Sequence, residues 1–176
     1  MDLEALSRIA MDGDRAALEL LLQNIYPLVY RFNIKLLRGT QEAQDLTQAV
    51  MVRVIENLHK YRVGPGSFQS WVFRISYNLF VDYTRKHKPV PVRDELLARV
   101  ADRRDAVRGA ELRDEAQRLL LALSREERAM MVMRYYLDLE YKAIAAALGV
   151  GEARVKWRLH EAKERMRKYA EEAGKT

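Results

Sequence analysis

The sequence contains no cysteine, and its 176 residues include only 8 glycines and 4 prolines. The absence of cysteine excludes a disulfide scaffold, a thiol nucleophile and a cysteine-ligated zinc, and it suits a reducing cytoplasm. The scarcity of glycine and proline argues against a turn-rich β protein. No apolar run approaches the roughly 20 residues of a membrane span, and the first residues are acidic where a signal peptide would be basic. We therefore expect a cytoplasmic protein without direct membrane insertion.

The sequence does carry an excess of positive charge, +6 overall, and this excess lies in two separate stretches. Residues 61–93 have 6 basic side chains and 1 acidic one, and residues 149–176 have 8 and 5. The stretches 1–60 and 94–148 each have a net charge of −1. Two separated basic stretches are expected of a protein that contacts a polyanion twice. Charge alone does not decide between nucleic-acid binding and a solubilising surface.

The hydrophobic pattern predicts an all-α protein, because nearly every segment has helical periodicity. We expect helices over residues 3–12, 14–37, about 41–60 and 68–86, the second of them broken or bent near Pro27. Two prolines, Pro89 and Pro91, end this unit. The architecture predicted is therefore two small helical domains, 1–87 and 111–176, joined by a linker over 88–110.

The second domain has the pattern of a helix-turn-helix. A short helix ends at Leu148, Gly149 supplies a left-handed turn, and a longer helix begins near Glu152. An ordinary helical hairpin is the alternative. Upstream, Ser124 and Glu127 have capping-box spacing at a helix start.

The last helix discriminates between these alternatives better. Its apolar stripe consists of Val155, Leu159, Ala162 and Met166, and Trp157 lies on the opposite side, where a partner is expected. In a recognition helix the first turns enter the major groove of DNA. The candidates for contacts to base edges are Arg154, Trp157, Arg158 and Glu161, and those for contacts to phosphates are Lys156, Lys163 and Arg165.

Aromatic and basic side chains alternate over residues 61–88, a combination that suits single-stranded nucleic acid. An ordinary core explains part of this pattern. The better candidates for contact are Tyr61, Asn78 and Arg85, and the adjacent glycine-containing loop could hold an extruded base. Residues 44–54 form an amphipathic helix, which fits either a protein-docking surface or a solvated face.

These segments together resemble the sigma-70 family, specifically its small extracytoplasmic-function class. Region two of that family is matched by Asp45-Leu46-Thr47-Gln48 and by Phe68-x-x-Trp71-Val72-Phe73-Arg74-Ile75-x-x-Asn78-x-x-x-Asp82. Region four is matched by Leu123-Ser124-x-Glu126-Glu127-Arg128, Tyr141-x-x-Ile144-Ala145-x-x-Leu148-Gly149 and Val155-Lys156-x-Arg158-Leu159-x-x-Ala162-Lys163.

The resemblance implies an alternative sigma factor that brings core RNA polymerase to promoter DNA and has no catalytic residue, metal or cofactor of its own. Contacts to core polymerase, at its beta-prime clamp, fall on Asp45, Leu46, Gln48, Ala49, Val52 and Arg53. Contacts to the melted −10 element fall on Tyr61, Arg62, Gly64, Gly66, Asn78, Arg85, Lys86 and Lys88. Contacts to the duplex −35 element fall on Arg154, Lys156, Trp157, Arg158, Glu161 and Arg165. Further partners implied are the beta flap of polymerase and an anti-sigma factor, often membrane-anchored.

Three residues depart from the family pattern. Trp157 and Glu161 stand where a small serine and a basic residue are common, so an unusual −35 sequence is expected. Ala49 replaces a frequent glutamate in the docking helix. A free-standing helix-turn-helix regulator is the alternative to a sigma factor. A nucleic-acid enzyme is a third hypothesis, but the sequence shows no clustered carboxylates and no phosphate-binding glycine loop for it.

Overall fold

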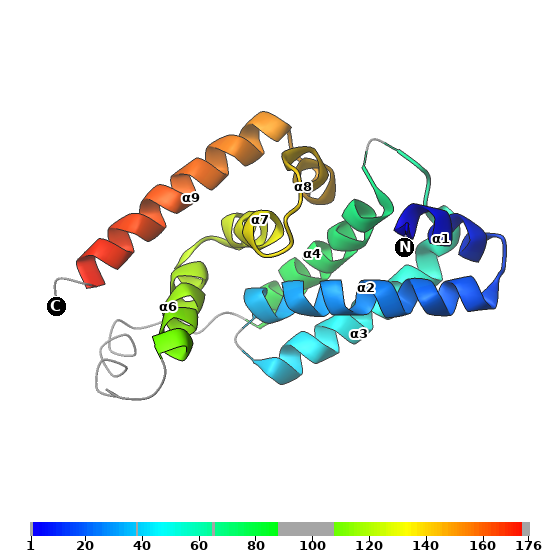
Figure 1. Ribbon diagram of the computed structural model, residues 1–176, viewed down its shortest axis with the longest axis horizontal. Coiled ribbons are helices and arrows are strands. Elements are labelled where there is room, and N and C mark those ends of the chain that lie inside the picture. Colours follow the sequence, from blue (N-terminus) through cyan, green and yellow to red (C-terminus); the bar gives the residue numbers. More distant parts are fainter. Residues whose placement is uncertain (1, 38, 65, 88–107, 174–176) are drawn as a thin grey trace.

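The computed structural model describes residues 2–37, 39–64, 66–87 and 108–173, and every regular element in them is helical. The first half contains α1 (Leu3–Met11), α2 (Arg15–Leu36), α3 (Thr40–Asn57), the short 3-10 helix η1 (Leu58–Lys60) and α4 (Phe68–Lys86). The second half contains α6 (Arg108–Ala122), α7 (Arg125–Tyr135), α8 (Tyr141–Leu148) and α9 (Glu152–Ala173). The all-α prediction is confirmed for the described residues (Figure 1).

The first half is a bundle in which α2 packs against α1, α3 and α4. Its apolar core includes Leu21 and Ile25 of α2, Val50 of α3, and Phe68 and Val72 of α4. Side-chain oxygens of Asp14 and Ser67 accept from main-chain amides at the starts of α2 and α4. These N-caps explain why the helices begin where they do.

Helix α2 runs through Pro27 without a break, so of the two expected outcomes, a broken or a bent helix, the break is wrong. Proline removes only one backbone donor from the helix. The neighbouring Ile25 and Val29 are at most 1% exposed, and their packing in the core holds the helix continuous on both sides of Pro27.

Three buried polar side chains join α2, α3 and α4. The amide nitrogen of Asn33 donates to Thr47 Oγ1 at 3.1 Å, and the Ser76 hydroxyl donates to the amide oxygen of Asn33 at 2.9 Å. The Thr47 hydroxyl donates in turn to the main-chain oxygen of Ala43 at 2.7 Å. Because buried polar groups are costly when unpaired, this network fixes the relative positions of the three helices.

Three local features of the second half confirm predictions from the sequence, although Met166, the fourth member of the expected stripe of α9, is only partly buried. Ser124 and Glu127 form the expected capping box at the start of α7. Gly149 has φ +68°, the left-handed conformation expected between α8 and α9. In α9, Val155, Leu159 and Ala162 are at most 3% exposed.

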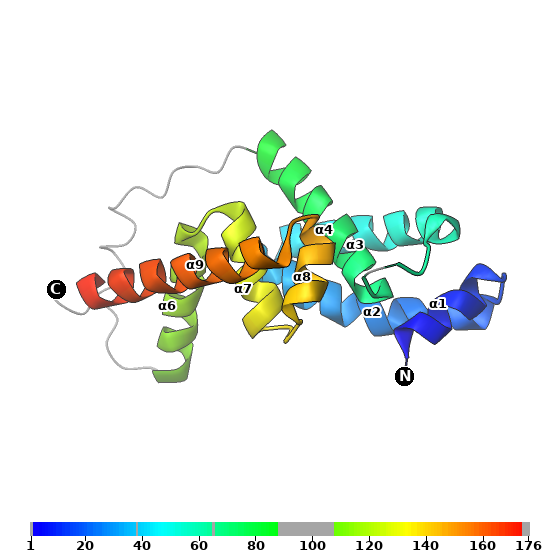
Figure 2. The same ribbon diagram turned by 90° about the horizontal axis from the view of Figure 1, so that it is seen from above.

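The two halves pack against each other, which the sequence did not reveal. Helix α4 lies against α8 and α2 against α7 (Figure 2). One apolar cluster runs from Phe32, Phe73 and Phe80 into the second half. Most of the expected linker lies outside the described residues, and its last three residues, 108–110, begin α6.

Hydrogen bonds over long sequence separations reinforce this packing. The Arg74 guanidinium donates from Nε to the main-chain oxygen of Ala146 in α8 at 3.1 Å, and its Nη2 reaches the same oxygen. Arg128 of α7 donates to the main-chain oxygen of Leu36 at 2.9 Å. Both arginines thus bind helix carbonyl groups of the opposite half of the molecule, at the carboxyl ends of α8 and α2.

Candidate nucleic-acid interface

Helix α9 presents a mixed polar and aromatic face on the side away from its buried stripe. Trp157 is 56% exposed, as expected for a side chain that meets a partner. The guanidinium carbon of Arg158 lies 5.0 Å from the centre of the Trp157 ring. In the first turns of α9, Arg154 pairs with Glu126 at 3.0 Å and Lys156 with Glu152 at 2.8 Å. All these cations remain at least a third exposed and so accessible to a phosphate.

Glu127 is 1% exposed and joins α7 to α9. One carboxylate oxygen accepts from Ser124, and the other faces Arg165 and, at 3.6 Å, Arg158. Burial by itself would raise the pKa of Glu127, but the hydrogen bonds from Ser124 and Arg165 outweigh burial and lower that pKa. Glu127 is therefore a buried anion at the base of the candidate interface.

Tyr61 is not at the surface. Its side chain is 3% exposed, and its ring packs against Phe68 and Trp71. Its hydroxyl donates to the Glu4 carboxylate at 2.8 Å, and the backbone amide of Phe68 donates to the same carboxylate at 2.9 Å. Burial, and then the hydrogen bond to Glu4, raise the pKa of Tyr61. The Tyr61 ring is therefore covered in this structure, and its contact with an unstacked base stays a prediction.

The other candidates for −10 contacts are spread along the loop and α4. Arg62 is exposed and donates to the main-chain oxygens of His59 and Tyr61, both at 2.9 Å. Arg85 pairs with Asp82 at 2.9 Å. Gly64, Asn78 and Lys86 are exposed, and Gly66 is half-buried. Lys88 lies outside the described residues.

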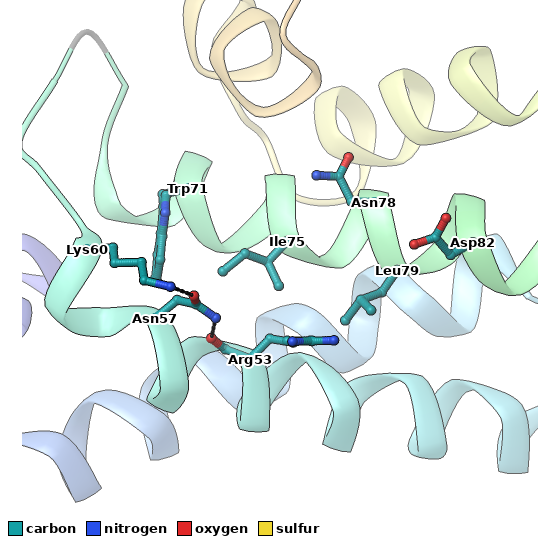
Figure 3. A pocket seen from close by; sticks show the side chains of 8 residues that line it. All are labelled: Arg53, Asn57, Lys60, Trp71, Ile75, Asn78, Leu79 and Asp82. Carbon is teal, nitrogen blue, oxygen red and sulfur yellow. Dashed lines mark hydrogen bonds between the residues drawn. The ribbon is translucent and has the colours of Figure 1, made fainter.

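A groove of about 390 Å³ separates α3 from α4 in the first half (Figure 3). Its lining is formed by Arg53, Asn57, Lys60, Trp71, Ile75, Asn78, Leu79 and Asp82. Asn57 accepts from Lys60 Nζ at 3.0 Å and donates to the main-chain oxygen of Arg53 at 2.9 Å. The groove thus combines fixed polar groups and cations with an aromatic ring.

Helix α3 turns five of the six expected docking residues to the surface, namely Asp45, Gln48, Ala49, Val52 and Arg53. Val52 is 52% exposed, and the nearby Ile55 is 47% exposed. The sixth residue, Leu46, is 6% exposed and belongs to the core, so its side chain supports the helix rather than forming its outer face.

Sequence reasoning missed the roles of Glu4 and Glu127. The sequence pattern predicts only a capping box for Glu127, and no local signal relates Glu4 to Tyr61, 57 residues away. In the part of the chain that the structure describes, no group of three or more histidine, aspartate or glutamate residues could hold a metal ion. No helix in that part is long and apolar enough to cross a membrane.

In the described residues the second half contains a helix-turn-helix whose last helix, α9, exposes Trp157 and several cations, and the first half is a helical bundle. The family models for Sigma-70 region 2 and Sigma-70 region 4 match residues 21–90 and 113–166. The chain belongs to the sigma-70 family, in its extracytoplasmic-function (ECF) class, and it is an alternative sigma factor rather than a free-standing regulator.

Several curated relatives support this assignment. The chain is 31% identical to the ECF RNA polymerase sigma factor SigE of Mycolicibacterium smegmatis, over 89% of this chain and 64% of the relative. It is 28% identical to SigW of Bacillus subtilis, over 89% and 90% of the two chains. It is also 28% identical to RpoE of Cereibacter sphaeroides, over 96% and 94%.

Two solved structures share the fold. The structure of CnrH in complex with the cytosolic domain of CnrY matches with a TM-score of 0.75 and 19% identity, over 97% of this chain and 98% of that one. The sigma factor RpoE of Bartonella quintana, in complex with the anti-sigma factor NepR, matches with a TM-score of 0.67 and 20% identity, over 87% and 96%.

Proposed function

We propose that this protein binds core RNA polymerase in the cytoplasm, directs it to promoters with two separate DNA-binding surfaces, and performs no catalysis itself. The observation that carries the proposal is the presence of both sigma regions in one chain, in this order, each on its own set of helices. Domains over 1–87 and 111–176, joined through 88–110, would then contact two promoter elements. The energy of DNA binding offsets the cost of unstacking bases, a few kcal/mol per step.

The proposed polymerase-docking surface is the exposed face of α3. Val52 and Ile55 are large apolar side chains about half exposed, with Asp45, Gln48 and Arg53 around them. An apolar centre with a polar rim is the usual composition of a protein interface. We assign this face to the clamp of the beta-prime subunit, and the second domain to the beta flap.

The proposed −10 surface is the loop before α4 together with α4 itself. Arg62, Gly64 and Gly66 belong to the loop, and Asn78 and Lys86 are exposed on α4. The groove between α3 and α4 supports this assignment, because Trp71 and Asn78 of α4 both line it together with the polar side chains of Arg53, Asn57 and Lys60 (Figure 3). Stacking on aromatic rings and pairing with cations are the two interactions that hold single-stranded nucleic acid.

The proposed −35 surface is the first half of α9, with Arg154, Lys156, Trp157, Arg158 and Glu161. Arg158 is the strongest candidate for a base contact, because its guanidinium group is oriented by both Trp157 and Glu127. The carboxylate of Glu161 can accept from a cytosine amino group and would repel phosphate. A −35 sequence that differs from the family's common one is therefore expected.

An anti-sigma factor is a further proposed partner. Among the solved structures that share this fold, one is a sigma factor in complex with the anti-sigma factor NepR, and another is CnrH in complex with the cytosolic domain of CnrY. We propose that this chain has a comparable inhibitor, which could be anchored in the membrane.

Run-off transcription with core polymerase tests the proposal. Core polymerase with this protein should give discrete transcripts from genomic DNA fragments, and core polymerase alone should not. Val52→Glu should weaken holoenzyme formation, whereas Ile9→Glu, an equally exposed apolar residue on α1, should not. If no discrete transcript forms although the protein binds core polymerase, or if both variants weaken assembly equally, the proposal is wrong.

A further inference from the structure

Glu127 takes part in the N-cap of α7 and, in addition, contacts two arginines of α9. Its Oε2 atom accepts from the amide of Ser124 at 3.1 Å and from the Ser124 hydroxyl at 2.6 Å, which completes the cap. Its Oε1 atom takes no part in the cap and faces Arg158 and Arg165. A buried carboxylate thus has one oxygen for α7 and one for α9.

The two arginines bind Glu127 unequally. Arg165 Nη2 donates a hydrogen bond to Oε1, whereas Arg158 Nη1 lies 3.6 Å from the same atom, beyond hydrogen-bond distance. In the described residues, the Nε atom of Arg158 is buried and has no hydrogen-bond partner. Its guanidinium group lies over Trp157. Arg158 is therefore oriented from two sides, and its side chain donates no hydrogen bond to any residue that the structure describes.

The charges in this cluster leave Arg158 able to bind an acceptor elsewhere. One carboxylate faces two guanidinium groups, so the cluster keeps a net positive charge. Because Arg165 already satisfies Oε1, Arg158 can turn to a base or a phosphate without leaving a buried carboxylate unpaired, which would be costly. Both arginines line a groove of about 470 Å³ beside Tyr77 and Val81 of α4.

We propose that Glu127 is a positioning residue for −35 recognition: it orients Arg158 toward the DNA, and Arg165 acts as the cation that compensates Glu127 rather than as a phosphate contact. The proposal rests on the proposed function of α9. It assigns Arg165 a role inside the protein, where the family resemblance had suggested a contact to DNA.

Glu127→Gln is the main test, because glutamine also completes a capping box but carries no charge. The holoenzyme would be titrated with promoter duplexes carrying the natural or a scrambled −35 element, at several salt concentrations. In the variant, the ratio of the two affinities should fall by about tenfold, part of what a bidentate arginine contact provides. Binding to both duplexes should become more salt-dependent, because a competing anion has been removed.

Two controls separate positioning from a general effect. Glu164→Gln also removes one negative charge, but from an exposed ion pair with Arg167 within α9. It should leave the affinity ratio unchanged. In an Arg158→Gln background, Glu127→Gln should have no further effect on that ratio, because Glu127 acts through Arg158. An equal loss in both backgrounds, or no loss in the folded Glu127→Gln protein, would overturn the proposal.

Arg165→Gln provides a second test that leaves the helix cap in place. With Arg165 gone, Glu127 holds Arg158 back, so the affinity ratio should fall. A plain phosphate contact would instead lower the affinity for both duplexes by the same factor, which would refute the role given to Arg165. If the unmodified holoenzyme does not distinguish the two duplexes at all, α9 does not read the −35 element and the proposed function of α9 is wrong. That result is distinct from one that refutes only the positioning role of Glu127.

Discussion

Replacing Gly66 with alanine tests the contact between the two halves of the molecule. A Cβ atom at position 66 would lie 2.8 Å from the Cβ of Ala146 on α8 and 3.3 Å from the Cβ of Ser70. Neither atom is the end of a flexible side chain, so the loop or α8 must move. Overpacking of this kind costs about 1–3 kcal/mol. Gly66 does not have a positive φ, so the backbone adds no strain.

The partner variant Ala146→Gly removes the atom that the new methyl group would meet. Alone, it should lower the free energy of unfolding by up to about 1 kcal/mol, the cost of glycine in a helix. In the double variant the clash is gone, so the combined loss should be smaller than the sum of the single losses by about 1–3 kcal/mol. Urea denaturation followed by circular dichroism measures all three values.

Gly64→Ala is the matched control in the same loop. A Cβ there would lie 3.6 Å from the main-chain oxygen of Arg62, an ordinary contact, so the change in stability should stay within about 0.5 kcal/mol. If Gly66→Ala is as mild as this control, or if its effect and that of Ala146→Gly are simply additive, α8 does not pack against the loop as described.

Three further predictions concern groups that the structure places in new roles. Tyr61→Ala should lower the free energy of unfolding by about 3–5 kcal/mol. Tyr61→Phe should lower it by about 1–3 kcal/mol and preserve promoter opening. Loss of promoter opening in a stable Tyr61→Phe protein would show that the hydroxyl contacts DNA. Arg128→Lys should lower the free energy of unfolding by about 1–3 kcal/mol, because lysine cannot replace the hydrogen bonds that Arg128 donates to several main-chain oxygens, including that of Leu36. An unchanged midpoint of urea denaturation would contradict this. Since folding lowers the pKa of Glu127 from its ordinary value of 4.5, its contribution to stability should be complete above that value and disappear as the pH falls through the lower folded pKa. Glu127→Gln should reduce this acid sensitivity in a series of urea titrations, and an unchanged series would count against it.

Local features of the fold could be predicted from the sequence because their determinants lie within a few residues. The capping box of Ser124, the left-handed Gly149 and the buried stripe of α9 all depend on short spacings. The exposed position of Trp157 followed from the same helical periodicity. Family resemblance supplied the rest of the function.

Features that depend on distant contacts could not be predicted. Helix α4 has apolar residues on two faces, and no local rule indicates that Phe73 and Phe80 join a cluster extending into the second half. Tyr61 beside a glycine-containing loop suggests an exposed ring, whereas its packing on Phe68 and Trp71 and its bond to the distant Glu4 bury it. The double role of Glu127 depends likewise on Arg165, 38 residues away.

Sequencing the 5′ ends of transcripts made by the reconstituted holoenzyme on genomic DNA tests the central claim most directly. We predict start sites that share two elements at a fixed separation. In this assay Arg158→Ala should relax the upstream element only, and Asn78→Ala the downstream element only. Start sites without a shared pair of elements, or two variants that relax the same element, would contradict the assignment of one DNA surface to each half of the molecule.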